Sequence, residues 1–446
     1  MSRLLSLLLM SALSLSTYAQ TDTLRAADHM SNTQLEKLSR NSKIIYIDGK
    51  REPSEENHVR DSLIRRIQSF YYDQFRHYHD PNAPYFQFMS RDAQLTMGIG
   101  GAVRMRGYYD FKGMIPSPAF APYMIPMNKN SQDDKQLGTT PAGTCLFFWM
   151  SGQSRAFGKY LLYIEANFNG YNARDFHLKK AYVQWREYTL GLAPSTFSDP
   201  ASQTPMVDAN GTANKVAPTN VLFRYMPVVR NRWVFAVSVE DPSSPAQLST
   251  DDETCSKVHK WFPDFAAFAQ YQWSKDEHVR LSGLYRLMTY RDLVNANKYN
   301  VSGWGVQLST VAKPYRQLTL YGNFVYGHGY TSVLNDLMIG SYDLIPKPGE
   351  PGRMYSPGAF GWHVGAQWHF RPNLFACVAA GQVRYLPHYA VAPDEYKYGQ
   401  IVTANVFWDP TPRTEFAIEY DWGRRVDKSG MRADAHRIGA VVQFSF

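Results

Sequence analysis

Hydrophobic and polar residues alternate one by one along most of this chain. In LTMGIGGAVRMRGYYDF, residues 95–111, the odd and even positions separate into an apolar and a polar set. The apolar set is Leu95, Met97, Ile99, Val103, Met105, Tyr109 and Phe111, and the polar set includes Thr96, Arg104, Arg106 and Asp110. A helix cannot separate them, because both arginines would lie beside apolar positions. This period of two predicts a β-strand longer than most strands of soluble proteins.

The same alternation recurs as far as the C-terminus. Clear examples are YLLYIEANF (160–168), RWVFAVSVE (232–240), GAFGWHVGAQWHF (358–370) and TEFAIEYDWG (414–423). Counted from residue 94, the pattern predicts about 16 strands.

The connections between these strands are of two kinds. Short turns are expected at 274–277, 313–316, 371–373 and 409–413, and long polar loops at 113–142, 194–218, 241–262, 330–358, 387–398 and 424–435. Short turns at one end and long loops at the other are typical of outer-membrane barrels. We therefore predict an all-β protein, a transmembrane up-and-down antiparallel β-barrel over residues 91–446, in the outer membrane of a Gram-negative bacterium.

The N-terminal residues follow other patterns. Residues 1–19 have a basic start, a short apolar run and a small-residue exit, which predicts a secretory signal peptide. Residues 20–90 are expected to form a partly helical periplasmic extension, with Leu63, Ile64, Ile67, Phe70 and Tyr71 at helical spacing. This helix could stand in the periplasm, contact another subunit or plug the barrel, and its periodicity does not separate these roles.

The chain ends on a half-apolar strand, IGAVVQFSF, whose last residue is Phe446. Because every strand in hydrocarbon must be paired, this strand is expected to close against the first one with its apolar side in lipid. A terminal aromatic strand also resembles the signal that barrel assembly machinery recognises, which makes Phe446 a candidate membrane-insertion signal.

Composition agrees with a barrel. A mean hydropathy of -0.40 suits strands that turn only alternate residues to lipid, and 15% aromatic residues suit two interfacial girdles. An all-β periplasmic sugar-binding sandwich would also be rich in aromatic residues.

The net charge of +8 is scattered along the chain, so we expect no nucleic-acid partner. No metal or cofactor is expected either, because the calcium-like DANG at 208–211 has Thr219 where the bidentate Glu should be.

Four segments resemble the DcaP-type porins of Gram-negative outer membranes. They are APYFQFMSRDAQLTMGIGGAVRMRGYYDF (83–111), AYVQWREYTLGLAPSTFSDP (181–200), NVLFRYMP (220–227) and RWVFAVSVEDPSSP (232–245). The resemblance implies a homotrimer of 16-stranded barrels with an N-terminal extension, passing small anionic solutes such as dicarboxylates.

Candidate selectivity residues follow from the strand alternation and one loop. Loop 194–218 resembles the inward-folding loop of general porins, which would bring Asp199, Asp208 and Lys215 to the wall; an ordinary surface loop is the alternative. Basic residues expected to point into the lumen are Arg104, Arg106, Lys180, Arg186, Arg224, Arg280, Arg286 and Arg437. Acidic residues share that face, namely Glu165, Glu240, Glu415, Glu419 and Asp421, so a charge-balanced lumen competes with an anion-attracting one.

These observations favour an outer-membrane porin for passive diffusion of small hydrophilic, anionic solutes. Its expected partners are outer-membrane lipid, anionic solutes, two further copies of the chain and the barrel assembly machinery. We expect no enzyme, because no nucleophile, His and acid occur in a supporting motif. The alternative function is a structural or adhesive barrel with a blocked lumen.

Overall fold

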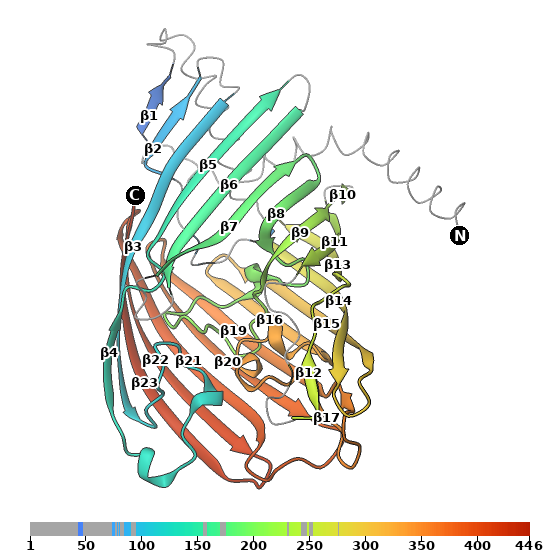
Figure 1. Cartoon of the computed structure of the whole chain (residues 1–446). Helices are drawn as coiled ribbons and strands as arrows, with labels where there is room; N and C mark the ends of the chain where they lie inside the picture. The colour runs from blue at the N-terminus through green and yellow to red at the C-terminus, as the bar shows by residue number, and fades with distance from the viewer. Residues whose placement is uncertain are drawn as a thin grey trace, which may run out of the picture.

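The last strand of the chain pairs with the first long one and closes a single antiparallel sheet into a barrel of 16 strands (Figure 1). This computed structural model describes residues 43–47, 74–75, 78, 80, 84–90, 95–154, 158–169, 175–229, 232–241, 248, 253–274 and 276–446. The predicted signal peptide and the helix expected around residues 63–71 lie outside the described residues.

Each wall strand is hydrogen-bonded to its neighbours in sequence order. The wall strands are β3 (Leu95–Lys112), β5 (Cys145–Ser154), β6 (Gly158–Asn169), β7 (Asp175–Trp185), β8 (Tyr188–Pro194), β9 (Thr219–Tyr225), β11 (Trp233–Asp241), β13 (Asp264–Ser274), β14 (Glu277–Asp292), β15 (Lys298–Tyr315), β16 (Leu318–His328), β19 (Gly358–Arg371), β20 (Leu374–Leu386), β21 (Tyr396–Thr411), β22 (Thr414–Asp427) and β23 (Arg432–Ser445).

Shorter elements lie at the barrel ends and in the loops. The remaining strands are β1 (Lys43–Tyr46), β2 (Phe86–Met89), β4 (Gln136–Thr140), β10 (Val228–Val229), β12 (Cys255–Lys257), β17 (Ile345–Pro346) and β18 (Met354–Tyr355). The 3-10 helices are η3 (Pro122–Met124), η4 (Lys129–Ser131), η6 (Pro200–Ser202), η7 (Thr331–Val333) and η8 (Leu337–Gly340). Within the described ranges, no helix is long and apolar enough to cross a membrane.

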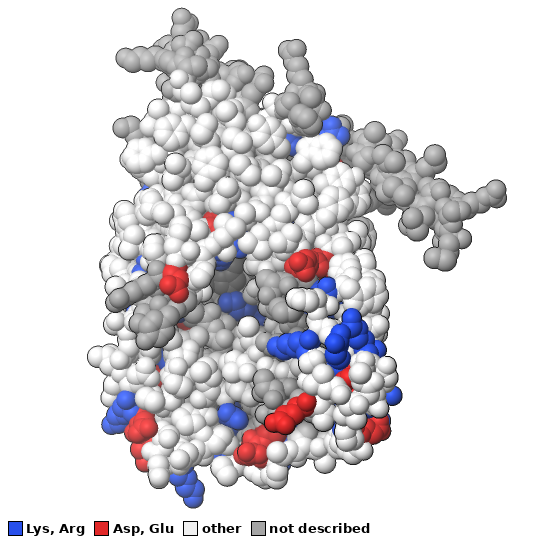
Figure 2. Space-filling model, in the orientation of Figure 1, with Lys and Arg blue, Asp and Glu red and all other residues white. Residues whose placement is uncertain are grey.

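The predicted two-residue alternation is confirmed in the wall. In β3, Ile99 and Met105 are 57% and 54% exposed, whereas Arg106 and Asp110 on the other face are buried. Because an isolated barrel exposes its lipid-facing side chains, the exposed apolar face is the membrane face. On the side of the molecule seen in Figure 2, described charged side chains are sparse over β5 to β8, as a lipid-facing surface requires.

The C-terminal strand β23 is placed as predicted. Phe444 is exposed on the lipid side and Ser445 is buried on the lumen side. Phe446 continues the seam, because its amide donates to Gly101 O (2.9 Å) and its carbonyl accepts from Gly101 N–H (3.1 Å).

Short and long connections are sorted to opposite ends, as expected. β13 and β14 are joined by residues 275–276 and β15 and β16 by 316–317, whereas β16 and β19 are separated by 329–357. The prediction of a long loop at 424–435 is wrong. There β22 and β23 run on and leave only 428–431 between them, since Arg424 and Asp434 pair across the two strands (2.7 Å).

Glycines near the start of β3 make room for close neighbours. A Cβ on Gly98 would lie 2.5 Å from Pro84 Cγ, and one on Gly101 would lie 2.3 Å from Cys145 O. Such distances exclude a side chain, so Gly98 lets Pro84 of the N-terminal segment lie close against β3.

Candidate functional site

The connection between β8 and β9, residues 195–218, folds into the barrel, and we call it the inner loop. Most of its residues are buried. It meets residues 329–357 at an isolated bridge between Val216 and Leu334, and its Thr196 amide donates to Glu240 of β11 (2.8 Å). Buried backbone groups require such partners. The loop therefore narrows the lumen, as its resemblance to the porin loop implied.

Asp199 fixes the inner loop to one side of the wall. Its carboxylate is fully buried and lies 2.9 Å from His278 Nε2, 3.5 Å from Arg280 Nη1 and 2.5 Å from the donating Ser309 hydroxyl. Burial alone would raise the pKa of Asp199. The charges of Arg280 and His278 and the two hydrogen bonds outweigh it and hold that pKa well below its ordinary value. Asp199 is thus an ionised anchor that faces the wall as predicted.

Glu419 of β22 holds the same loop on the opposite side. Its carboxylate accepts the amide hydrogens of Val207 (2.7 Å) and Asp208 (2.6 Å), and Asn405 Nδ2 donates to it (2.9 Å). The inner loop is therefore fastened to both walls and crosses the lumen between them.

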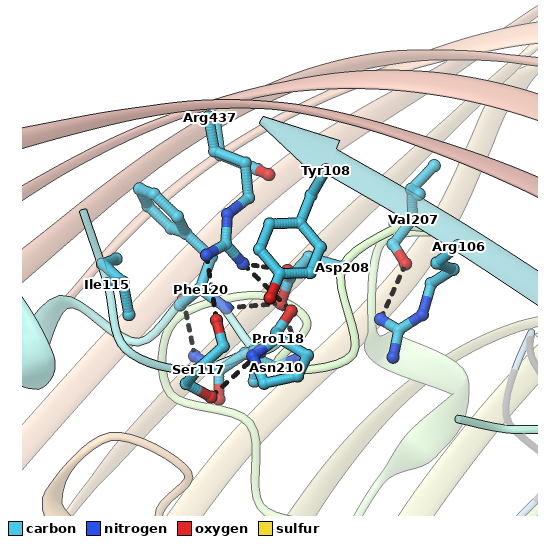
Figure 3. A network of polar contacts seen from close by, with 12 residues as sticks. Arg106, Tyr108, Ile115, Ser117, Pro118, Phe120, Val207, Asp208, Asn210 and Arg437 are labelled. Carbon is cyan, nitrogen blue, oxygen red and sulfur yellow. Dashed lines mark hydrogen bonds and ion pairs between the residues drawn. The ribbon is translucent and has the colours of Figure 1, made fainter. Parts of the chain in front are cut away.

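Asp208 joins the inner loop to the connection between β3 and β5, as Figure 3 shows. Its carboxylate accepts from the amides of Phe120 (2.9 Å) and Asn210 (2.8 Å) and lies 3.3 Å from Arg437 Nη1. Arg437 also donates to the carbonyl oxygens of Ser117 (2.9 Å) and Pro118 (3.0 Å). Two loops far apart in sequence are thereby held against β23.

A second connection, residues 329–357, packs beside the inner loop. Asp343 accepts from Thr331 (3.0 Å) and from the Ser332 amide (3.0 Å), and it lies 3.5 Å from Arg286. Arg286 is also paired with Asp264 of β13 (3.1 Å). Arg286 points inward as predicted, but it binds protein carboxylates and not an open water column.

The other predicted basic residues differ in what they contact. Arg224 is buried, donates to Pro194 O (3.1 Å) and lies over the Phe75 ring (3.7 Å). Lys180 is buried and paired with Asp80 (3.0 Å). Arg224 and Lys180 therefore point inward as predicted but are covered by protein.

Arg104 and Arg106 are the two cations of β3, and they are not equivalent. Arg106 is buried and donates to Val207 O of the inner loop (3.3 Å). Arg104 is only half-buried, and its Nε donates to Gln443 (2.6 Å). Arg104 can therefore still meet a solute.

Arg186 does not lie on the lumen wall. β7 ends at Trp185, and Arg186 takes a left-handed backbone conformation (φ 51°) in the two-residue turn before β8. Its exposed guanidinium lies over the Trp185 ring (5.6 Å). The alternation that placed Arg186 inward stops one residue earlier.

Sequence alternation missed Lys179, because β7 contains a bulge there. Glu165 of β6 is opposite Lys180 and Ala166 is opposite Leu178, so Lys179 has no opposite residue. Lys179 and Lys180 thus both reach Glu165, at 2.8 and 3.6 Å. The visible signal was the adjacent pair of lysines, which a strict period of two cannot place on one face.

Lys215 of the inner loop lies in the same region. Its Nζ donates to Ala209 O (3.3 Å), and part of its side chain stays exposed. The surrounding protein still desolvates the ammonium group, and this burial together with the charge of Lys179 lowers the pKa of Lys215 to about 8, against the attraction of Asp208. Figure 2 shows Lys and Arg side chains in the hollow of this face.

The wall is a closed barrel of 16 strands, and its fifth strand, β8, leads into the inward-folded inner loop. This is the architecture of an outer-membrane porin. The family model of the DcaP outer membrane protein matches residues 87–446, so the chain belongs to that family. It is a protein of the Gram-negative outer membrane with a porin fold, and its family and structural neighbours are channels and not enzymes.

Solved structures agree on the fold. The outer membrane channel DcaP of Acinetobacter baumannii superposes with a TM-score of 0.67 at 18% identity over 79% of this chain and 98% of its own. An anion-selective porin from Comamonas acidovorans gives 0.53 at 10% identity over 79% and 100%. No curated protein matches this sequence.

Proposed function

We propose that this porin passes small hydrophilic anions, dicarboxylates among them, by passive diffusion. The observation that carries the proposal is a difference in exposure between the two signs of charge around the inner loop. Arg104, Lys179 and Lys215 keep part of their surface exposed, whereas Glu165 and Asp208 are buried. A narrow opening with accessible cations and covered carboxylates concentrates anions.

One acid near Arg104 stays partly exposed. Glu415 of β22 is half-buried, but its carboxylate accepts a hydrogen bond from the Tyr78 hydroxyl (2.7 Å). Its charge is therefore directed at a protein donor and reduces the attraction for anions without reversing it.

The accessible cations also suit carboxylates chemically. A guanidinium offers paired N–H donors to a carboxylate, and an ammonium acts as a point charge. The charge of Lys179 acts on Lys215, so these two accessible cations share one region of the lumen. A solute with two carboxylates could contact two of them at once, as the resemblance to dicarboxylate-associated porins implies.

Reversal potentials in planar bilayers test this function. We expect single channels whose reversal potential in a salt gradient is displaced toward the anion potential. Lys179→Gln, which removes a side chain that is 35% exposed, should reduce that displacement. Arg186→Gln is the matched control, since Arg186 lies in the turn before β8 with its guanidinium over the Trp185 ring and not on the lumen wall. Cation preference in the unmodified protein would refute the proposal.

The homotrimer belongs to the same proposal and is supported by the family alone. Chemical cross-linking in native outer membranes should give a species of three chains, and a chain that remains single would contradict it.

A structural or adhesive barrel with a blocked lumen is the second candidate. Buried contacts between Tyr78 and the inner wall favour it, since they place N-terminal residues where solute would pass. A protein that inserts into bilayers and never conducts would support this candidate.

A further inference from the structure

Five described residues that precede the barrel lie inside it, and we call them the strap residues. They are Gln74, Phe75, Tyr78, Asp80 and Pro84. Each contacts a side chain that the strand alternation turns into the lumen, and together they reach widely separated parts of the wall.

Phe75 is buried between two of the lumen arginines. Its ring lies 3.7 Å from the guanidinium carbon of Arg224 and 5.5 Å from that of Arg280, and 6.0 Å from the ring of Phe268. Gln74 beside it accepts from Arg280 Nη2 through its side chain (3.2 Å). A ring over a desolvated guanidinium is an attractive contact, and it covers both arginines.

Tyr78 contacts another part of the wall, on β20 to β22. Its hydroxyl donates to Glu415 Oε2 (2.7 Å), and its ring packs against Phe375 (5.9 Å) and Phe407 (5.3 Å). Burial and the nearby Glu415 carboxylate raise the pKa of Tyr78 well above its ordinary value, so the hydroxyl stays a donor.

Asp80 and Pro84 reach the remaining side. Asp80 lies 3.0 Å from Lys180 Nζ and 3.7 Å from Lys179 Nζ. Pro84 fills the space that a side chain on Gly98 would need, beside the indole of Trp149. Beyond Pro84 the chain leaves the lumen as β2, which pairs with β3 from Phe86 opposite Ile99.

Several of these contacts lie at the short-turn ends of the strands. Arg280 is the fourth residue of β14, which begins at Glu277 directly after a short turn. Phe375 and Glu415 are the second residues of β20 and β22, which also follow short turns. Short turns mark the periplasmic end of such barrels. The strap residues therefore occupy the periplasmic half of the lumen, and Arg280 joins them to the inner loop by donating to Ser198 O (3.0 Å).

We propose that the strap residues form an intrachain plug that closes the periplasmic half of the channel, and that conduction requires their release. This rests on the proposed channel function. Release would also uncover Arg224, Arg280 and Lys180, which adds accessible cations to the open channel. Its contacts include the Phe75 ring, the Tyr78 hydrogen bond and the ion pairs of Asp80, which are separable by substitution.

The test uses the full chain with Cys145→Ser and Cys255→Ser, which leaves Cys377 as the single thiol. Cys377 is buried in the cluster of Phe375 and Phe407 against which Tyr78 packs. Phe75→Ala with Tyr78→Ala should raise the fraction of time that single channels are open several-fold and accelerate labelling of Cys377 by a small charged methanethiosulfonate. Tyr85→Ala is the control, because Tyr85 is 39% exposed on the same segment and its ring packs on Phe86.

A second pair of variants, with smaller changes in side-chain volume, keeps the proposal testable if the double alanine variant does not assemble. At nearly constant volume, Asp80→Asn removes the charge that pairs with Lys179 and Lys180, and Tyr78→Phe removes the hydrogen bond to Glu415. Each should shift both readouts in the same direction by a smaller factor. Folded variants that match the unmodified protein in the fraction of time open and in labelling would overturn the plug. Faster labelling with no conductance in any variant would uphold the plug and refute the channel function.

Discussion

Arg437 and Asp110 form a buried two-point ion pair across the seam where the last strand meets the first. Arg437 Nε lies 2.6 Å from Asp110 Oδ1 and its Nη2 donates to Oδ2 at 2.9 Å, with both side chains 1% exposed. β23 and β3 are 327 residues apart at these positions. A pair of this kind fixes the register in which the barrel closes.

Arg437→Met should destabilise the closed barrel. It leaves the Asp110 and Asp208 carboxylates without their shared cation, and breaking a buried pair on one side typically costs about 3–5 kcal/mol. Urea unfolding in detergent micelles measures the loss. Arg424→Met is the control, since the Arg424 to Asp434 pair is partly exposed (29% and 26%) and should contribute less than about 1 kcal/mol. Equal losses in the two variants would contradict the role of the seam pair.

Arg104→Ala and Arg106→Ala should differ in their effect on ion selectivity. Arg104 is half-buried and accessible, so its removal should shift the reversal potential toward cations. Arg106 is buried against Val207 O, so its removal should act mainly on the position of the inner loop and appear as current noise. A larger selectivity shift from Arg106→Ala would place the accessible cation elsewhere.

Anion preference should fall as the pH rises through about 8, the lowered pKa of Lys215. Below that pH the ammonium is charged and attracts anions; above it the amine is neutral and the attraction weakens. Reversal potentials recorded from about pH 6 to about pH 10 would show the change, well below the ordinary titration range of lysine near 10.4. Lys215→Met should remove this step, and its persistence in the variant would assign it to another group.

A chain ending at Ser445 should reach the outer membrane less efficiently. It loses two backbone hydrogen bonds to Gly101 and the terminal aromatic proposed as an insertion signal. Fractionation of outer membranes and periplasm measures the yield. Phe444→Ala removes a lipid-facing aromatic of the same strand and keeps the terminus, so it should insert nearly normally.

The barrel could be predicted from sequence because lipid and lumen impose a period of two that few other environments impose. Ile99, Met105 and Arg106 fall on the faces that the alternation assigns. The pattern fails where the backbone leaves the ideal strand, at the Lys179 bulge and at the Arg186 turn. The pattern also predicts too great a length for the last loop, because charged residues such as Arg424 can pair across strands that continue beyond the membrane.

The contents of the lumen could not be predicted in the same way. Alternation tells that Arg224 or Arg286 points inward, but not whether water or protein meets it there. Asp199 and Asp208 were expected at the wall from a loop resemblance, yet their partners His278 and Arg437 are fixed only by tertiary packing. The contact of Phe75 with Arg224 joins segments that no local pattern connects.

The extra residue in β7 has a consequence for how such pores change in evolution. Phe176 and Leu178 face lipid, while Lys180 and Tyr182 face the lumen, so the strand changes its phase at Lys179. Deletion of that single residue would restore an unbroken phase and take one positive charge out of the pore, with every lipid-facing side chain left in place. Strand length, as well as residue type, is thus a means by which selectivity can be inherited and altered.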